Sequence, residues 1–261
     1  MSTAPYILVV EDEAMVTQAV RLICTDAGLL VTAVDNATEA LGLLQENRYR
    51  LVLCDIMMQE LDGFGFLKQV DRLGIDTPVI MMTGYSTMQN AVRSLAAGAI
   101  DYIPKPFTAD ELLAVIRRSL RSGELLAATE CAQLEGKSRL SYVPCPANYL
   151  RLGYVSWVSM EDEGTARIGV SDLFIKAIDG IQVIELAEPG EDLVQGVPCS
   201  KVTAADGITH EIMCPMSGRI LEVNEEAQAR PSLIEKDPYF RGWLYRILPS
   251  NPENNLQWLS L

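Results

Sequence analysis

The sequence has no uninterrupted apolar run of about 18 residues, the length that a membrane-spanning helix needs. It has one histidine, and none of its six cysteines forms a Cys-x-x-Cys pair. These absences argue against a helical membrane anchor and against a zinc site or disulfide framework built on closely spaced ligands. The segment Met1 to Pro5 also lacks the basic region of a secretory signal. We therefore expect a soluble, cytoplasmic chain with reduced cysteines.

Basic charge is scarce as well. The formal net charge is -14 and the pI is about 4.5. Neither half is basic, because residues 1–122 hold 10 basic and 15 acidic side chains and residues 123–261 hold 11 and 20. Affinity for nucleic acids comes largely from Lys and Arg side chains that release counterions from phosphates. We therefore expect no nucleic-acid partner.

The 261 residues, of which 49% are hydrophobic, are sufficient for two ordinary globular domains. We predict a first domain at residues 1–122, a helical or irregular linker at 123–147 and a second domain at 148–261. Apolar residues at helical spacing extend the last helix of the first domain past Gly123 toward Cys131. This extension could form a homodimer contact or pack on its own domain, and both alternatives stay open.

In the first half, short apolar runs alternate with amphipathic stretches. The expected strand and helix pairs are Tyr6–Val10 with Ala14–Asp26, Leu30–Val34 with Ala37–Glu46, Leu51–Cys54 with Phe64–Leu73, Val79–Met82 with Met88–Ala97, and Ala99–Ile103 with Ala109–Arg121. Such alternation predicts a parallel sheet with helices on both faces. Functional sites of these sheets lie at the carboxyl ends of the strands.

Polar side chains stand at four of these strand ends. Glu11 and Asp12 follow the first strand, Asp55 the third and Thr83 the fourth, and Lys105 comes just after the fifth. Because the carboxyl ends of parallel strands meet at one edge of the sheet, we expect these side chains to converge there.

The motifs that carry these residues resemble the receiver domain of two-component response regulators. They are Val9-Val10-Glu11-Asp12-Glu13, Asp55-Ile56-Met57-Met58-Gln59-Glu60-Leu61-Asp62-Gly63, Met82-Thr83-Gly84 and Lys105-Pro106-Phe107, and the resemblance spans residues 5–121. It implies a flavodoxin-like (βα)5 fold and a phosphorelay function. It also implies that a sensor histidine kinase or a phosphotransfer protein supplies the phosphoryl group.

The resemblance assigns Asp55 as the nucleophile that becomes an aspartyl phosphate. It implies a Mg²⁺ ion held by Asp12, Asp55 and the main-chain carbonyl of Met57, with Glu11 acting through a bound water. A carboxylate that attacks a phosphoryl donor must overcome charge repulsion, so this reaction depends on neutralising charge. A divalent cation among three carboxylates meets that need.

The resemblance gives the remaining site residues a role after phosphoryl transfer. Lys105 and the Thr83 hydroxyl would contact phosphoryl oxygens, and Tyr102 would move into the space behind Thr83 as the family's switch. Lys105-Pro106 would be a cis peptide, although the sequence alone favours trans. Gly63 and Gly84 could mark either close backbone approach or simple turns.

The second half changes to short strands separated by Gly, Pro and Asp turns, which predicts a mostly-β domain. The expected strands are Tyr154–Ser159, Thr165–Val170, Gly180–Leu186, Pro198–Thr203, His210–Met213, Gly218–Val223 and Trp243–Ile247. His210 is expected to be a surface or strand residue rather than a metal ligand.

Several phrases of this half resemble the glycine cleavage H-protein, a lipoyl carrier with a barrel-sandwich hybrid fold, over roughly residues 148–251. They include Trp157-Val158, Cys214-Pro215-Met216-Ser217-Gly218 and Gly242-Trp243-Leu244. In that family the lipoyl lysine stands eight residues before the turn proline, and here this position is Gly207. The nearest lysine, Lys201, is six residues away and is expected within a strand. The resemblance thus implies the carrier fold without its attachment amine.

We therefore expect a Mg²⁺-dependent response regulator that is not an enzyme beyond its own phosphorylation and dephosphorylation. Its second domain would signal by binding a protein partner that the sequence does not identify. A lipoyl-carrier metabolic protein and a phosphate-independent docking module are the alternatives. Gly207 argues against the first, and the complete set of acidic, Thr and Lys residues argues against the second.

Overall fold

A computed structural model describes residues 6–84, 88–134 and 140–261. Residues 1–5 and the linker residues 135–139 lie outside this description. The chain forms two compact units that divide near Gly123, and each is described by itself. The domain limits given above remain predictions. No helix in the described ranges is long and apolar enough to cross a membrane.

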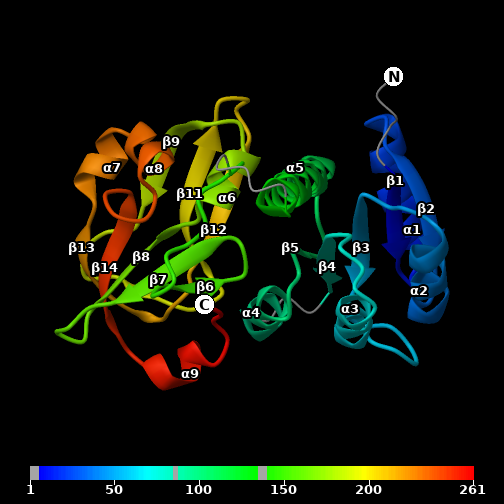
Figure 1. The fold of residues 1–261 in the computed structure, drawn as a ribbon, viewed down its shortest axis with the longest axis horizontal. Helices are drawn as coiled ribbons and strands as arrows, with labels where there is room; N and C mark the ends of the chain where they lie inside the picture. The colour runs from blue at the N-terminus through cyan, green and yellow to red at the C-terminus, as the bar shows by residue number, and fades with distance from the viewer. Residues whose placement is uncertain (1–5, 85–87, 135–139) are drawn as a thin grey trace. The chain divides into compact units, whose positions relative to one another are not determined.

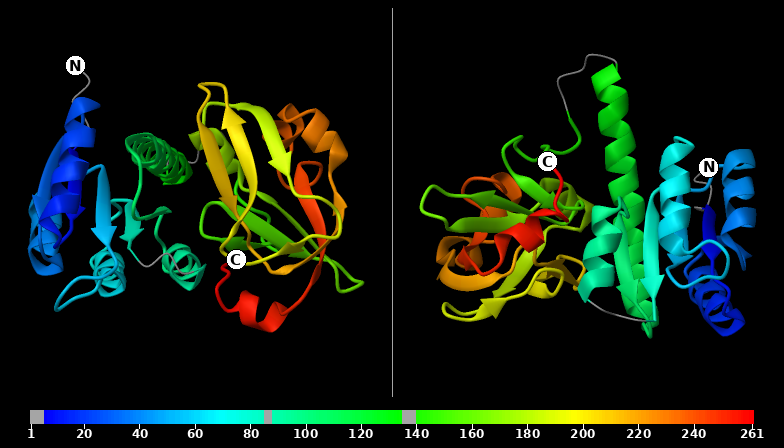
Figure 2. Two further views of the ribbon diagram at one scale, coloured as in Figure 1. Left: turned by 180° about the vertical axis from the view of Figure 1, so that it is seen from behind. Right: turned by 90° about the horizontal axis from the view of Figure 1, so that it is seen from below.

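The first unit is a parallel five-stranded sheet with helices on both of its faces (Figures 1 and 2). Its strands are β1 (Tyr6–Val10), β2 (Leu30–Val34), β3 (Leu51–Asp55), β4 (Val79–Thr83) and β5 (Asp101–Pro104). Its helices are α1 (Ala14–Asp26), α2 (Ala37–Glu46), α3 (Gly63–Arg72), α4 (Met88–Ala96) and α5 (Ala109–Leu134). The strand order β2-β1-β3-β4-β5 confirms the flavodoxin-like expectation. Helix α5 does continue past Gly123, as its apolar spacing predicts.

Apolar strands place the core of this unit at the centre of the sheet. Strands β3 and β4 are buried along their whole length, as are the last four residues of β1. Side chains that are apolar on both faces suit a parallel sheet covered by helices on both sides. Strand order reverses at the β1–β3 pair, so the crevice for a functional site lies beyond the ends of these two strands.

The second unit is built mainly from two antiparallel sheets (Figure 1). The larger sheet has the order β10 (Asp192–Leu193), β13 (Gly218–Val223), β14 (Trp243–Pro249), β8 (Ala166–Val170), β7 (Ser156–Met160) and β6 (Leu150–Leu152). The smaller has the order β12 (Thr209–Met213), β11 (Pro198–Ala204) and β9 (Ile181–Leu186). Trp157 and Tyr245 are the largest fully buried side chains of this core. The mostly-β expectation is confirmed.

Several short elements of this unit are absent from the prediction. They are the strands β6 and β10 and the helices α6 (Asp172–Ala177), α7 (Glu225–Ala229), α8 (Ser232–Lys236) and α9 (Pro252–Leu256). Each has six residues or fewer, so apolar periodicity cannot develop within it.

The β11–β12 hairpin turns through residues 205–207, with the Ala204 N–H bonded to the Ile208 carbonyl at 2.9 Å and the glycine as the last loop residue. Gly207 has a φ of 82°, its N–H donates to the Ala204 carbonyl at 3.0 Å, and the Ile208 N–H donates to the Asp206 side chain at 3.0 Å. A Cβ atom at Gly207 would meet nothing within 4 Å. The hairpin of a carrier-type fold is therefore formed, with an exposed glycine at its tip.

Candidate functional site

Three carboxylates meet at the carboxyl edge of the parallel sheet. Glu11 and Asp12 come from the turn after β1, and Asp55 is the last residue of β3. One ligand oxygen from each lies within 4.8 Å of the others. Glu11 is 1% exposed and Asp55 is 3% exposed, whereas Asp12 is exposed to solvent. The structure thus brings together the acidic residues that the motif order singles out.

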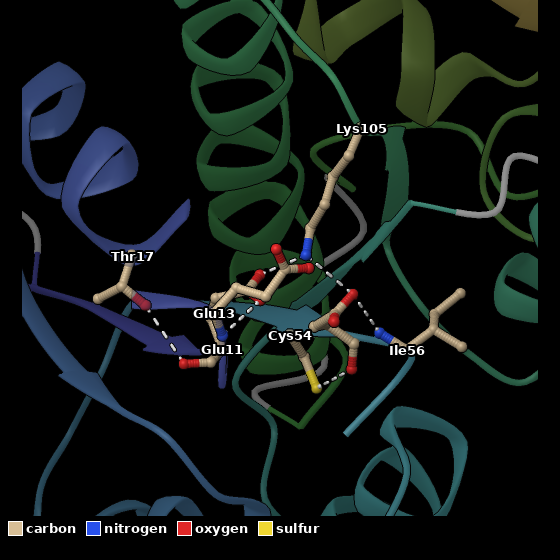
Figure 3. Close-up of polar contacts among 7 residues, drawn as sticks. Glu11, Glu13, Thr17, Cys54, Ile56 and Lys105 are labelled. Carbon is tan, nitrogen blue, oxygen red and sulfur yellow. Dashed lines mark hydrogen bonds and ion pairs between the residues drawn. The ribbon is translucent and has the colours of Figure 1, made fainter. Parts of the chain in front are cut away.

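Lys105 bridges the two buried carboxylates. Its Nζ lies 2.5 Å from Glu11 Oε2 and 3.1 Å from Asp55 Oδ1. Figure 3 shows the lysine side chain reaching across the end of the sheet to Glu11. The Lys105-Pro106 peptide is cis, as the family resemblance implies. This lysine supplies one positive charge to a cluster of three carboxylates.

Burial and mutual charge shift the pKa values of Glu11, Asp55 and Lys105. Burial raises the pKa of Glu11, and the nearby Asp55 charge adds to the rise while Lys105 opposes it. Burial likewise raises the pKa of Asp55 against the opposing influence of Lys105. Burial acts to lower the pKa of Lys105, but its contacts with Glu11 and Asp55 outweigh burial and raise it. The folded site therefore holds negative charge at an electrostatic cost.

Main-chain donors and a close glycine fix Asp55. Its carboxylate accepts a hydrogen bond from the Ile56 N–H at 2.9 Å and another from the Met57 N–H. Gly63 packs against the same segment, and a Cβ there would lie 2.9 Å from Ile56 Cα and closer still to the Asp55 carbonyl. Gly63 is thus a site of close backbone approach. Gly84 is not, because a Cβ there would meet nothing within 4 Å.

Thr83, Met57 and Tyr102 occupy the places that the motifs give them, and their roles remain predictions. Thr83 is a fully buried residue at the end of β4, and its carbonyl accepts the Lys105 N–H at 2.6 Å. The Met57 side chain is 58% exposed. Tyr102 in β5 is 7% exposed, and burial raises its pKa.

The donor set fits a hard divalent cation. Magnesium prefers carboxylate, carbonyl and water oxygens and binds through one or two carboxylates. Three carboxylates outnumber the single ammonium group beside them, and burial makes that excess costly. Asp12, Asp55 and Glu11 are therefore suited to hold the ion, directly or through water.

A solvent-facing hollow of about 340 Å³ adjoins the acidic residues. Its lining residues are Glu11, Asp12, Ala14, Thr17, Ala33, Val34, Asp35 and Glu39. The exposed side of the carboxylate cluster can thus be reached by a small molecule or a partner side chain.

Two contributors to this site were not expected from the sequence. The Thr17 hydroxyl donates to the Glu11 carbonyl at 3.2 Å, and the Cys54 thiol donates to the Asp55 carbonyl at 3.3 Å. Thr17 lies in the first turns of a helix and Cys54 in an apolar strand. Neither position carries a sequence signal that distinguishes it from an ordinary surface or core residue.

The second unit shows no matching cluster among the residues that the structure describes. Lys201 lies within β11, 3.5 Å from Glu211 on the neighbouring strand, so it is not at the hairpin tip. His210 is a strand residue, as one alternative held, but it is buried at 5% exposure against Phe174. Cys199 and Cys214 are buried free thiols.

Family models match both halves of the chain. Residues 7–117 match the model described as the response regulator receiver domain. Residues 149–260 match the model of the glycine cleavage H-protein. Both resemblances drawn from the motifs are confirmed.

The chain spans about half the length of the curated relatives that it matches. The transcriptional regulatory protein DltR of Streptococcus agalactiae is 40% identical over 124 residues, which are 48% of this chain and 55% of DltR. Among solved structures, the receiver domain of a Francisella response regulator aligns with a TM-score of 0.43 at 32% identity and covers 44% of this chain and 96% of its own. The Mycobacterium marinum glycine cleavage H protein aligns with a TM-score of 0.38 at 28% identity and covers 40% and 86%.

Proposed function

Because residues 7–117 form a response regulator receiver domain and residues 149–260 a glycine cleavage H-protein domain, we propose that the chain is a two-component response regulator. In this proposal Asp55 accepts a phosphoryl group from a sensor histidine kinase or a phosphotransfer protein. The observation that carries it is the contact of Lys105 with both Glu11 and Asp55 in a cluster of three carboxylates.

The reaction forms one bond and breaks one. A carboxylate oxygen of Asp55 attacks phosphorus, and the bond from phosphorus to the donor's leaving atom breaks with its electron pair departing on the donor. The Ile56 and Met57 N–H groups orient the attacking carboxylate. Lys105 Nζ, already 3.1 Å from Asp55, donates to a phosphoryl oxygen, and the Thr83 hydroxyl donates to another.

A bound Mg²⁺ would supply the larger part of the positive charge that the transferring phosphoryl group requires. Asp12 and Asp55 would hold it directly, together with the Met57 carbonyl, and Glu11 would act through water. With that positive charge present, Lys105 would be able to exchange its contact with Glu11 for one with the phosphoryl group.

The response of the chain to phosphorylation is part of the same proposal. New hydrogen bonds to Thr83, made only in the phosphorylated state, shift the equilibrium of the β4 end and of Tyr102 beside it. The H-protein domain passes this change to a protein partner rather than to nucleic acid, because the chain's net charge of -14 disfavours a phosphate backbone. Six free cysteines suit a reducing, cytoplasmic location, and no enzymatic output is proposed.

The test is phosphorylation of the full chain by acetyl phosphate, followed by intact mass. We expect one added phosphoryl group in Mg²⁺ and none when a chelator replaces the ion. Asp55→Asn should abolish the increment, and Asp62→Asn, which changes a nearby acid at the α3 N-cap, should keep it. Phosphorylation without a divalent cation, or an undiminished increment in Asp55→Asn, would contradict the proposal.

A further inference from the structure

The proposed chemistry gives no role to Thr17, although this residue contacts the acidic turn. We infer that Thr17 is a positioning residue: its hydroxyl holds the main chain of the turn that presents Asp12, and so sets the affinity of the site for Mg²⁺. The inference rests on the proposed function. The Thr17 hydroxyl donates to the Glu11 carbonyl at 3.2 Å, and Figure 3 shows this contact across the turn.

The target of this hydrogen bond distinguishes it from an ordinary helix contact. Threonine hydroxyls in helices commonly bond the carbonyl four residues earlier, which here belongs to Glu13. That carbonyl accepts the main-chain N–H of Thr17 at 3.0 Å, as in any α-helix, whereas the hydroxyl bonds the Glu11 carbonyl. The Thr17 hydroxyl reaches six residues back, to the first residue after β1 and outside the helix. It therefore ties helix α1 to the acidic turn.

The other contacts of this turn do not replace the hydrogen bond from Thr17. The Glu11 N–H donates to Val34 on β2 at 3.0 Å, which fixes where the strand ends. The N-cap residue of α1, Glu13, makes no side-chain cap. Its N–H instead donates to Glu11 Oε1 at 3.2 Å. Between the strand and the helix, the Thr17 hydroxyl and the Glu13 N–H hold the path of the chain.

Asp12 is the residue that depends on this path. It lies between Glu11 and Glu13 and is exposed to solvent, so the main chain on either side decides where its carboxylate lies. Its ligand oxygen is within 4.8 Å of those of Glu11 and Asp55. Magnesium requires near-octahedral oxygen geometry, and groups that orient its ligands contribute to affinity without touching the ion.

The experiment is a calorimetric titration of the full chain with Mg²⁺. Thr17→Val keeps the side-chain shape and removes the donor, and we expect the loss of this one hydrogen bond to weaken Mg²⁺ binding about fivefold to tenfold. Thr17→Ser keeps the donor and should stay within about twofold of wild type. Thr25→Val changes another threonine of α1, exposed and at the far end of the helix, and should have no effect.

Two further readouts separate positioning from damage to the fold. The phosphorylation rate of Thr17→Val should recover to near the wild-type rate at saturating Mg²⁺, because its chemical groups are intact. Its thermal midpoint without the ion should match that of Thr17→Ser. Unchanged Mg²⁺ affinity in Thr17→Val, or equal losses in both variants, would overturn the inference. Absence of Mg²⁺ binding in wild type would instead overturn the proposed function.

Discussion

The carboxyl edge of the parallel sheet and the tip of the β11–β12 hairpin differ in the functional side chains that they carry. At the first, ligand oxygens of three carboxylates lie within 4.8 Å of one another, and Lys105 contacts two of these carboxylates. At the second, the turn geometry is complete, but the side chain that a carrier would need is replaced by Gly207. Main-chain bonding and apolar packing thus maintain a fold, whereas a chemical function depends on a few side chains that the fold does not require.

The largest effect on stability should come from filling the space at Gly63 in the receiver. Gly63→Ala forces a Cβ against the Asp55 carbonyl and Ile56, and overpacking of this kind costs about 1–3 kcal/mol. We expect that loss in the free energy of unfolding followed by helical circular dichroism in urea, with phosphorylation also reduced. Gly84→Ala, with open space around its Cβ, is the control. Equal effects of the two substitutions would contradict the packing argument.

The stability of the receiver should depend on pH. The pKa values of Glu11 and Asp55 are raised on folding, so their contribution to stability is fully present below the unfolded-state pKa values and is lost as pH rises through the folded-state values. The raised pKa of Lys105 acts only near the alkaline end of the range. Without divalent ions, the receiver should therefore be less stable at pH 7 than near pH 5, and Mg²⁺ should reverse the loss.

The measurement is urea unfolding at both pH values in a chelator. All three tryptophans belong to the second half of the chain, so their fluorescence reports the H-protein domain while helical circular dichroism reports chiefly the receiver. Asp55→Asn should reduce the pH dependence of the receiver signal. It should leave the tryptophan signal as it is in wild type. A wild-type pH effect retained in Asp55→Asn would count against this electrostatic account.

The smallest effect on stability should come from Gly207→Lys, which restores an amine at the hairpin tip. Nothing crowds the added side chain, so the cost is that of the positive φ, about 1–2 kcal/mol at most, seen in the tryptophan signal. We expect this variant to gain a lipoyl group from a lipoate-attaching enzyme, and Gly207→Ala to gain none. A folded Gly207→Lys protein that remains unmodified would show that carrier chemistry was lost at more than one position.

The receiver site could be predicted because its signal is distributed along the chain in a fixed order. Five strand-helix units dictate one sheet edge, and polar residues at those strand ends must then meet. Thr17 could not be found in this way, because its partner is a main-chain carbonyl whose position depends on the turn. The left-handed φ of 64° at Glu60 was equally unpredictable, since glycine is the usual residue for it.

The second domain could be predicted in outline and not in detail. Strand β12 alternates exposed and buried residues, and His210 falls on the buried face with Ile212. This alternation could have predicted that His210 is buried, although the polarity of its side chain favours the surface. The short helices α6 to α9 follow from tertiary contacts instead. The buried Asn255 of α9, for example, is hydrogen-bonded to Gln195 at 3.0 Å and to the Ser217 N–H at 2.8 Å.

The assignment of phosphoryl transfer to Asp55 is tested by mapping where the phosphoryl group is attached. After acetyl phosphate and Mg²⁺, borohydride reduces an aspartyl phosphate to homoserine, and trypsin separates peptide 51–68, which contains Asp55, from peptide 202–219, which contains Gly207. We predict homoserine at position 55 and an unmodified hairpin peptide. Label on another carboxylate, or anywhere in the second half of the chain, would contradict the assignment of the chemistry to the edge of the parallel sheet.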